Sequence, residues 1–315
     1  MERDPQHELR IERAERSLEG LSVGDAFGER FFAPGDVIGP WLLERAITDP
    51  GPWRWTDDTA MALEIVQTLR EHGDIDEDAL VSRLLQRYRR EPWRGYGGGA
   101  HRLFETIAGG VPWQEASRAL FRGEGSFGNG GAMRVAPVGA YFAEDLDAVV
   151  EAAKRSATVT HAHPEGQAGA VAVAVAAAVA WQTRDEPADV AEARLLDEVL
   201  ARTPAGWTRD GIDKARNTER SARLENAAMR LGNGSETSSQ DTVPLCIWCI
   251  ARHLRSYEDA MWTTVEALGD RDTTCAIVGG VVALSAPAST MPAAWRQARE
   301  PLEGIALDDE SPLGP

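Results

Sequence analysis

The chain has 315 residues, with 50 aspartates and glutamates against 33 lysines and arginines, so its formal net charge is −17. Because an acidic surface is repelled by phosphate backbones and anionic membranes, we expect binding to neither a nucleic-acid backbone nor a membrane. Hydrophobic residues make up 43% and charged residues 26% of the sequence, which excludes a disordered chain and is typical of a globular protein with a deep core.

The apolar segments favour a cytoplasmic protein. The N-terminal residues contain no apolar signal sequence, and the longest apolar run, residues 168–181, is too short to span a bilayer and predicts a buried helix. Cys246, Cys249 and Cys275 lie inside apolar segments, without the second cysteine pair or the histidine cluster that a zinc site needs. We therefore expect three structural thiols in a reducing compartment.

Helical periodicity recurs along the whole chain, beginning with an amphipathic segment at residues 8–23 whose apolar side includes Leu9. Residues 34–52 predict a loop, and glycine-dense loops follow at 95–99, 123–131 and 232–239. Further helices are predicted after 56–59, at 76–88, from 101, at 113–120, from 132, and at 147–157, 168–181, 189–201, 210–231, 241–253, 257–268, 275–284 and 293–302. Since no strand pattern or repeat appears, we predict a compact all-α fold.

We expect one domain over residues 1–315, with a core at about 8–285 and a C-terminal extension at 286–315. The oligomeric state does not follow from the sequence, and a monomer is the simplest expectation.

The stretch Thr56-Asp57-Asp58 stands at the start of an apolar helix. Threonine and aspartate satisfy the free N–H groups there and complement the helix dipole, so the stretch predicts at least a helix cap. A cap needs only one such residue, however, and neighbouring carboxylates repel each other unless a cation shares them. Mg²⁺ prefers oxygen ligands of this kind, so a metal site is the second interpretation.

A second acidic cluster, Asp270-Arg271-Asp272-Thr273, precedes another apolar helix. Each cluster combines two carboxylates with a threonine hydroxyl. If the two helix starts meet in the fold, their oxygen atoms form a cage for one or two hard cations, which would polarise substrate hydroxyls and activate a water. Two separately capped helices are the alternative.

The glycine-dense loops at 95–99 and 123–131 predict backbone amides that surround an anion, for which a pyrophosphate is the natural candidate, although plain turns have the same composition. Phe127 lies among these glycines and either stacks on a base or ribose or packs against the protein. His161 either contacts the ligand or makes a polar contact at a helix start, and His163, beside Pro164, is interpreted as structural. No Ser-His-Asp triad or cysteine nucleophile is indicated.

Several of these stretches occur together, and in this order, in the ADP-ribosylglycohydrolase family, which the chain resembles over most of its length. The matching stretches are Gly24-Asp25-Ala26-Phe27-Gly28, Trp55-Thr56-Asp57-Asp58-Thr59, Arg94-Gly95-Tyr96-Gly97, Gly128-Asn129-Gly130-Gly131-Ala132-Met133-Arg134, Thr160-His161-Ala162-His163-Pro164 and Gly269-Asp270-Arg271-Asp272-Thr273.

The resemblance implies an all-α hydrolase with a central binuclear site for two Mg²⁺ or Mn²⁺ ions. The implied reaction is hydrolysis of the C1″ bond between ADP-ribose and a protein side chain or small acceptor. The implied metal ligands are Thr56, Asp57, Asp58, Asp270, Asp272 and Thr273. The residues implied to bind ADP-ribose are Gly97, Gly98, Gly99, Gly125, Ser126, Phe127, Gly128, Asn129 and His161.

In such a mechanism Asp57 or Asp58 takes the proton of the attacking water, and the acidic cage stabilises the positive charge that develops at the anomeric carbon. Two positions depart from the family pattern. Phe32 stands where many members have a glutamate, with Glu29 one turn earlier as the candidate to replace it, and Arg271 stands where a threonine is usual.

These departures keep two alternatives open: a non-catalytic or structural relative that binds ADP-ribose, and a two-metal phosphohydrolase that cleaves the pyrophosphate. Four substrate types fit the sequence equally well: ADP-ribose attached to arginine, to serine or to a nucleic-acid end, and the small molecule O-acetyl-ADP-ribose.

Overall fold

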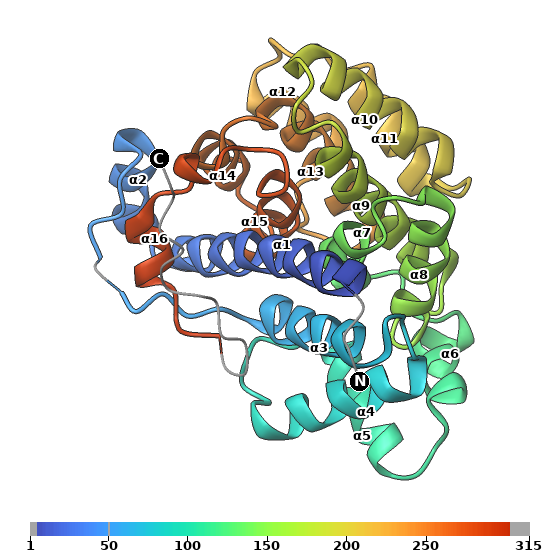
Figure 1. Cartoon of the computed structure of the whole chain (residues 1–315). Coiled ribbons are helices and arrows are strands. Elements are labelled where there is room, and N and C mark those ends of the chain that lie inside the picture. The colour runs from blue at the N-terminus through green and yellow to red at the C-terminus, as the bar shows by residue number, and fades with distance from the viewer. Residues whose placement is uncertain (1–4, 50, 303–315) are drawn as a thin grey trace.

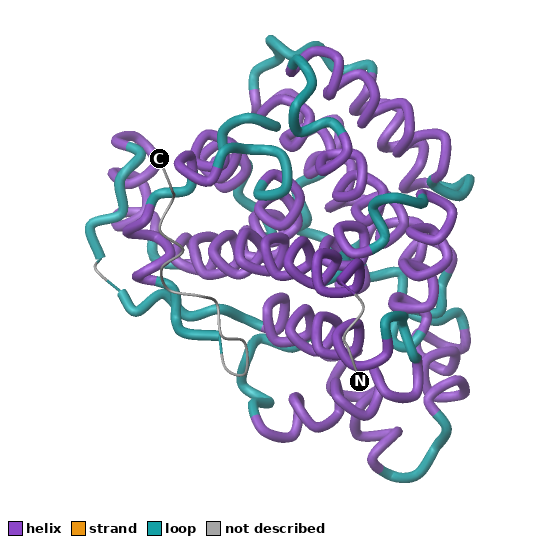
Figure 2. Tube along the Cα trace, viewed as in Figure 1, coloured by secondary structure: helices purple, strands orange, loops and turns teal. Residues whose placement is uncertain are grey.

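The computed structural model describes residues 5–49 and 51–302. Within these residues every regular element is a helix, and the only β-type pairings there are two isolated bridges (Figure 2). The predicted all-α fold is therefore confirmed. No helix in the described part of the chain combines the length and apolar composition needed to cross a membrane.

The α-helices are α1 (Pro5–Glu29), α2 (Gly35–Glu44), α3 (Asp57–His72), α4 (Glu77–Arg90), α5 (Gly98–Ala108), α6 (Trp113–Gly123), α7 (Ala136–Tyr141), α8 (Leu146–Thr158), α9 (Pro164–Gln182), α10 (Ala188–Arg202), α11 (Trp207–Arg216), α12 (Leu224–Leu231), α13 (Ser239–His253), α14 (Tyr257–Glu266), α15 (Arg271–Val282) and α16 (Ala293–Ala298). Three short 3-10 turns complete them: η1 (Arg30–Phe32), η2 (Asn129–Gly131) and η3 (Ala288–Thr290).

Helix α1 crosses the middle of the molecule, with α3, α4 and α5 on one side and α13, α14 and α15 on the other (Figure 1). It packs most extensively against α15, because glycines let the two backbones approach closely. A Cβ atom at Gly24 would lie 2.2 Å from the carbonyl oxygen of Cys275, and one at Gly28 would lie 2.2 Å from that of Arg271. This contact fixes the start of α15, which carries Asp272 and Thr273, beside the C-terminal half of α1.

Helix α9 forms a second core element. Its residues 168–180 are buried on every side, and it contacts α7, α8, α10 and α13. The buried helix predicted from the alanine- and valine-rich run is confirmed. The three cysteines are also buried and unpaired by disulfides, as expected.

The segment after α16 crosses back to the chain just before α3. The Trp53 amide donates to the carbonyl of Ala298 at 2.7 Å, and the Glu300 amide donates to the carbonyl of Trp53 at 2.8 Å. Trp295 on α16 stacks on Phe27 of α1 with ring centroids 4.5 Å apart. The part of the predicted C-terminal extension up to residue 302 therefore packs on the core, and residues 303–315 lie outside the described chain.

Three local predictions were wrong. Residues 34–52 were predicted as a loop but contain α2, which forms because Ile38 and Trp41 turn inward and are buried. Residues 210–231 form two helices with a break at 217–223, and Asn217 caps the first by donating to the carbonyl of Asp213. Leu9 is 60% exposed, since the first turns of α1 extend beyond the core.

Candidate functional site

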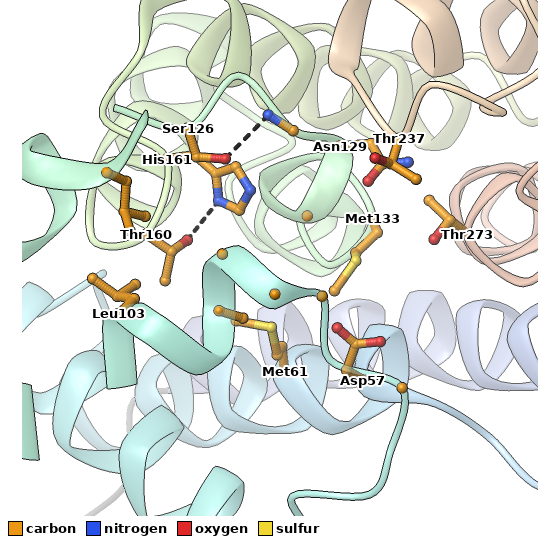
Figure 3. Close-up of a pocket in the computed structure, with 18 of the residues that line it drawn as sticks. Asp57, Met61, Leu103, Ser126, Asn129, Met133, Thr160, His161, Thr237 and Thr273 are labelled. Carbon is orange, nitrogen blue, oxygen red and sulfur yellow. Dashed lines mark hydrogen bonds between the residues drawn. The ribbon is translucent and has the colours of Figure 1, made fainter. Parts of the chain in front are cut away.

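A cavity of about 410 Å³ lies where the starts of α3, α5 and α15 face the loop between α6 and η2. In Figure 3, Asp57 and Thr273 lie at one end of this pocket, and Ser126, Thr160 and His161 lie at the other. The predicted site residues that line it are Asp57, Asp270, Asp272, Thr273, Gly97, Gly98, Gly99, Ser126, Gly128, Asn129 and His161. Sequence positions spread over most of the chain therefore meet in one cavity.

Asp25 on α1 fixes the segment that precedes α3. Its carboxylate is fully buried and accepts hydrogen bonds from the amides of Thr56 and Thr59, the shorter contacts being 2.9 and 3.1 Å. The hydroxyls of the same two threonines approach it at 2.9 and 2.5 Å. Asp25 thus orients Thr56 and the two aspartates that follow. Asp25 lies in a motif stretch of the sequence but was not predicted as a site residue.

Asp58 lies beneath the pocket, 1% exposed, and its Oδ1 atom has no hydrogen-bond partner. Its Oδ2 atom is 2.8 Å from the Thr56 hydroxyl, but that hydroxyl also lies against Asp25 and carries only one proton to donate. A buried carboxylate oxygen without a donor is costly unless a proton or a cation compensates it.

The two acidic clusters predicted from the sequence do meet. The Thr273 hydroxyl of α15 lies 3.4 Å from Asp58 Oδ2 of α3. Asp272 accepts from the Thr273 amide at 2.8 Å, and Asp270 accepts from the Asn129 side chain at 2.7 Å. Asn129 therefore connects the second glycine loop to the acidic end of the pocket.

Burial raises the pKa values of all these carboxyl groups, and for Asp57, Asp58 and Asp272 repulsion from neighbouring carboxylates raises them further. For Asp57, burial together with the charges of Asp25 and Asp270 raises the pKa to about 7, and for Asp25 burial raises it to about 6 against four hydrogen bonds that favour the ion. Burial and the charge of Asp25 hold the pKa of Asp58 well above its usual range. Burial and the charge of Asp270 do the same for the pKa of Asp272. The positive groups of the protein therefore do not balance the negative charge of these carboxylates.

The donor set fits a hard divalent cation. Every side chain concerned offers oxygen, and the unpartnered Oδ1 of Asp58 is the kind of atom that a cation completes. The cage is not closed, however: among the described residues, no group of three or more His, Cys, Asp or Glu side chains is arranged around a common point. The predicted metal ligands Thr56, Asp57, Asp58, Asp270, Asp272 and Thr273 stay a prediction for that reason.

The middle of the pocket is lined by the N-terminus of α5. Gly97 is its cap residue and contributes no capping side chain, so the first amides of the helix, at Gly98 and Gly99, have no intrahelical partner. Such amides and the helix dipole favour an anion. The predicted substrate residues Gly97, Gly98 and Gly99 are thus placed where an anionic group of a ligand would lie.

The second glycine loop forms the opposite wall. The Ser126 hydroxyl accepts from the Gly128 amide at 3.2 Å, and both residues line the pocket. Gly125 does not line it, but its φ of +78° and the 2.7 Å that would separate a Cβ from the His163 amide nitrogen explain why glycine is needed there.

His161 lines the pocket as a neutral ring. Its Nδ1 atom is 2.7 Å from the Thr160 hydroxyl, and burial, followed by the nearby charge of Arg134, lowers its pKa to about 3. Arg134 is fully buried behind it and donates to the carbonyl of Ser156 at 2.7 Å. Burial lowers the pKa of Arg134 to about 10, so it stays a cation near Asp57. The structural interpretation of His163 agrees with its role as the cap of α9.

Of the two interpretations of Phe127, packing against the protein agrees with the structure, and the role in ADP-ribose binding that the resemblance implies has no support from the pocket lining. Phe127 does not line the cavity, because it turns away to contact Phe121 and His163. Phe121 lines it instead, with left-handed backbone angles and with 41% of the residue's surface exposed. Phe121 was not predicted as a pocket residue, because residues 113–120 have the pattern of an ordinary helix whose end carries no sequence signal for this turn.

The two departures from the family pattern lie together at the end of α1. Arg271 donates to the carbonyl of Phe31 at 2.7 Å and stacks over the ring of Phe32, which is 49% exposed. Glu29 is half-buried, and burial and the charge of Asp25 raise its pKa, but it does not line the pocket. The geometry gives no support to Glu29 as a catalytic residue, whereas Asp57 faces the cavity directly.

Comparisons with known proteins agree on one family. The sequence model of the ADP-ribosylglycohydrolase family matches residues 6–311. ADP-ribosylhydrolase ARH3 of Mus musculus is 28% identical over 93% of this chain and 89% of its own length. ADP-ribosylarginine hydrolase Tri1 of Pseudomonas putida (strain GB-1) is 24% identical over 91% of this chain and 74% of its own. A solved structure described as an ADP-ribosylglycohydrolase-related protein complex superposes with a TM-score of 0.67, at 25% identity, over 93% of this chain and 94% of that one.

Proposed function

The chain belongs to the ADP-ribosylglycohydrolase family and is a hydrolase of ADP-ribosyl bonds, and we propose that it cleaves the C1″ bond between ADP-ribose and its acceptor with the help of bound Mg²⁺ or Mn²⁺. One observation carries the proposal. A single cavity joins an oxygen-rich end, a helix N-terminus and an exposed aromatic ring, represented by Asp57, Gly98 and Phe121.

These three surfaces follow one another along the cavity in the same order as the ribose, the pyrophosphate and the base in ADP-ribose. The hydroxyl-rich ribose that carries the acceptor would lie at the carboxylates, and the pyrophosphate would lie against the first amides of α5. The base would reach Phe121, since aromatic rings stack on bases. The cavity volume is in the range of small-ligand sites.

The chain's own residues would bind the ions, orient the substrate and take a proton from the attacking water. When bound, the divalent ions, two in our proposal, would supply the positive charge that holds the ribose hydroxyls and activates a water. Thr56, Asp57, Asp58, Asp270, Asp272 and Thr273 would hold them. Asp57 is the carboxylate of the first cluster that faces the cavity, so we assign it, rather than the buried Asp58, the proton of the attacking water. The negative charge of the carboxylates would also stabilise the positive charge that develops at the anomeric carbon in the oxocarbenium-like transition state.

The test is a product assay over a panel of conjugates: ADP-ribosyl-arginine, ADP-ribosyl-serine, a nucleic-acid end and O-acetyl-ADP-ribose, each with Mg²⁺ or with EDTA. We expect intact ADP-ribose, identified by mass, in the presence of Mg²⁺ only. We also expect Asp57→Ala and Asp272→Ala to lower the rate by at least ~100-fold. The panel also identifies the acceptor.

Three outcomes would contradict the proposal. AMP as product would show a phosphohydrolase that cleaves the pyrophosphate. ADP-ribose binding without turnover of any conjugate would favour a non-catalytic relative, the alternative that the exposed Phe32 motivates. Full activity in EDTA would show that the acidic cluster acts without a cation.

A further inference from the structure

Arg94 joins two segments of the chain that lie side by side at the acidic end of the pocket. It directly precedes Gly95, the first residue of the loop that leads into α5, and its guanidinium donates to the carbonyl of Trp55 at 3.1 Å. Trp55 in turn directly precedes Thr56. The same guanidinium stacks 3.5 Å from the centre of the Trp55 ring, so this residue is held through both its backbone and its side chain.

All five N–H groups of this guanidinium have acceptors. Two contacts, at 3.2 and 2.8 Å, reach one oxygen of Glu91, and one reaches Trp55. The remaining two form a fork with the carboxylate of Glu300 at 2.6 and 3.0 Å. The Arg94 side chain is 10% exposed, and such a planar, two-point arginine–carboxylate pair holds its partners in a defined geometry.

Glu300 comes from the far end of the described chain and is itself anchored at the same place. Its amide donates to the carbonyl of Trp53 at 2.8 Å, two residues before Trp55. Its backbone therefore binds the segment that leads into α3, while its side chain binds Arg94, which holds the same segment through Trp55. Glu91 is fixed independently, because Arg87 donates to it at 3.0 Å and also to Glu64 of α3 at 2.7 Å.

These contacts of Arg94 determine the distance between the loop at 95–99 and the acidic cluster. A Cβ atom at Gly95 would lie 3.5 Å from Asp57 Oδ1 and 3.8 Å from the Thr56 side chain, which are ordinary contact distances, so the loop lies only about one methyl group away from the cluster. A shift of the Arg94 contact would move both surfaces relative to each other, and a ligand that bridges them would bind less well.

We propose that Arg94 is a positioning residue that holds the loop at 95–99 in register with the segment 55–58, and that Glu300 holds Arg94 in place. This inference rests on the proposed function, since it assigns the pyrophosphate of the substrate to the loop and its ribose to the acidic cluster. Neither Arg94 nor Glu300 lines the pocket, so both act through the residues that do.

The experiment compares Glu300→Gln and Arg94→Lys with the matched control Glu192→Gln. Glu192 also accepts from an arginine, Arg220, at 2.7 Å, but it lies on α10 away from the pocket. Three quantities are measured for each variant: the affinities for Mn²⁺ and for ADP-ribose by calorimetry, kcat and KM on the conjugate that the wild type turns over, and the folded fraction by circular dichroism.

We expect Glu300→Gln to weaken ADP-ribose and Mn²⁺ binding by ~3- to 10-fold and Arg94→Lys by ~10- to 100-fold, the range for partners that orient a site. KM should rise more than kcat falls. The double variant should match Arg94→Lys alone, because both changes break one contact. Glu192→Gln should have the affinities, kcat and KM of the wild type.

A merely structural role would lower the folded fraction and leave both affinities of the folded protein unchanged. Affinities within twofold of wild type for Glu300→Gln would overturn the inference even if Arg94→Lys failed to fold. If the wild type hydrolyses no conjugate while both variants still lose affinity, the proposed function fails and the positioning role stands.

Discussion

Replacing Asp57 by asparagine should stabilise the metal-free protein while removing its response to Mg²⁺. Without a cation, burial and the charges of Asp25 and Asp270 raise the pKa of Asp57 from 3.8 to about 7. A carboxyl group whose pKa is raised in the folded state binds its proton more tightly there than in the unfolded chain. Its favourable contribution is thus present below pH 3.8 and is lost as the pH rises to about 7.

The size of the effect follows from this shift. A rise from 3.8 to about 7 corresponds to ~4 kcal/mol of unfolding free energy that is lost at pH 8 relative to strongly acid solution. Because Asp57 shares this repulsion with the other carboxylates of the cluster, a single substitution should recover only part of it, about 1–3 kcal/mol at pH 8, and less at pH 5. Asparagine keeps the shape of the side chain and one acceptor oxygen.

The assay is urea unfolding at pH 5 and pH 8, in EDTA and in Mg²⁺. In Mg²⁺ at pH 8, the wild type should gain stability by binding the ion in the folded state, and Asp57→Asn should gain little. Asp185→Asn, at a surface carboxylate that is 85% exposed, is the control. It should change neither the unfolding free energy in EDTA nor the gain in unfolding free energy on adding Mg²⁺. The reasoning is refuted if Asp57→Asn is less stable than the wild type at pH 8 in EDTA, or if Mg²⁺ stabilises both proteins equally.

Three further substitutions test separate parts of the site. Asp25→Ala removes the acceptor of three buried donors, the Thr56 and Thr59 amides and the Thr59 hydroxyl, and should lower the unfolding free energy by ~3–5 kcal/mol in urea; a loss below ~1 kcal/mol would contradict the role assigned to this carboxylate. Gly125→Ala adds a Cβ at positive φ against the His163 amide, so calorimetry should show at least ~10-fold weaker ADP-ribose binding, and unchanged affinity would show that the loop is freely deformable. Phe121→Ala should weaken ADP-ribose binding by ~1–3 kcal/mol, with Phe127→Ala as the smaller effect, and the reverse order would place the base elsewhere.

The elements with strong periodicity and local chemistry were predictable from the sequence. Helix α3 begins at Asp57 with Thr56 as its cap, so the cap interpretation is confirmed, and Thr273 reaches Asp58, so the two acidic clusters do meet. The cap and the cation interpretations do not exclude each other, because the Thr56 hydroxyl lies against Asp58 as well as capping the helix.

What escaped the sequence depends on long-range packing. Asp25 is an acid among small residues of a buried helix, and only the fold shows that four donors from 31 and 34 residues away converge on it. Phe121 was not predicted as a pocket residue, since only the left-handed turn at Phe121 in the folded chain brings its ring, rather than that of Phe127, to the cavity. The fork between Arg94 and Glu300 joins positions 206 residues apart and has no local signature.

The close contact between α1 and α15 also determines when the protein can fold during its synthesis. The glycine face of α1 meets a helix that the ribosome completes about 250 residues later, so this contact has a large sequence separation. At about 5–20 residues per second, α1 waits roughly 10–50 s before its partner exists. During that interval the apolar side of α1 is available to chaperones, and the candidate site cannot assemble before α15 has been synthesised.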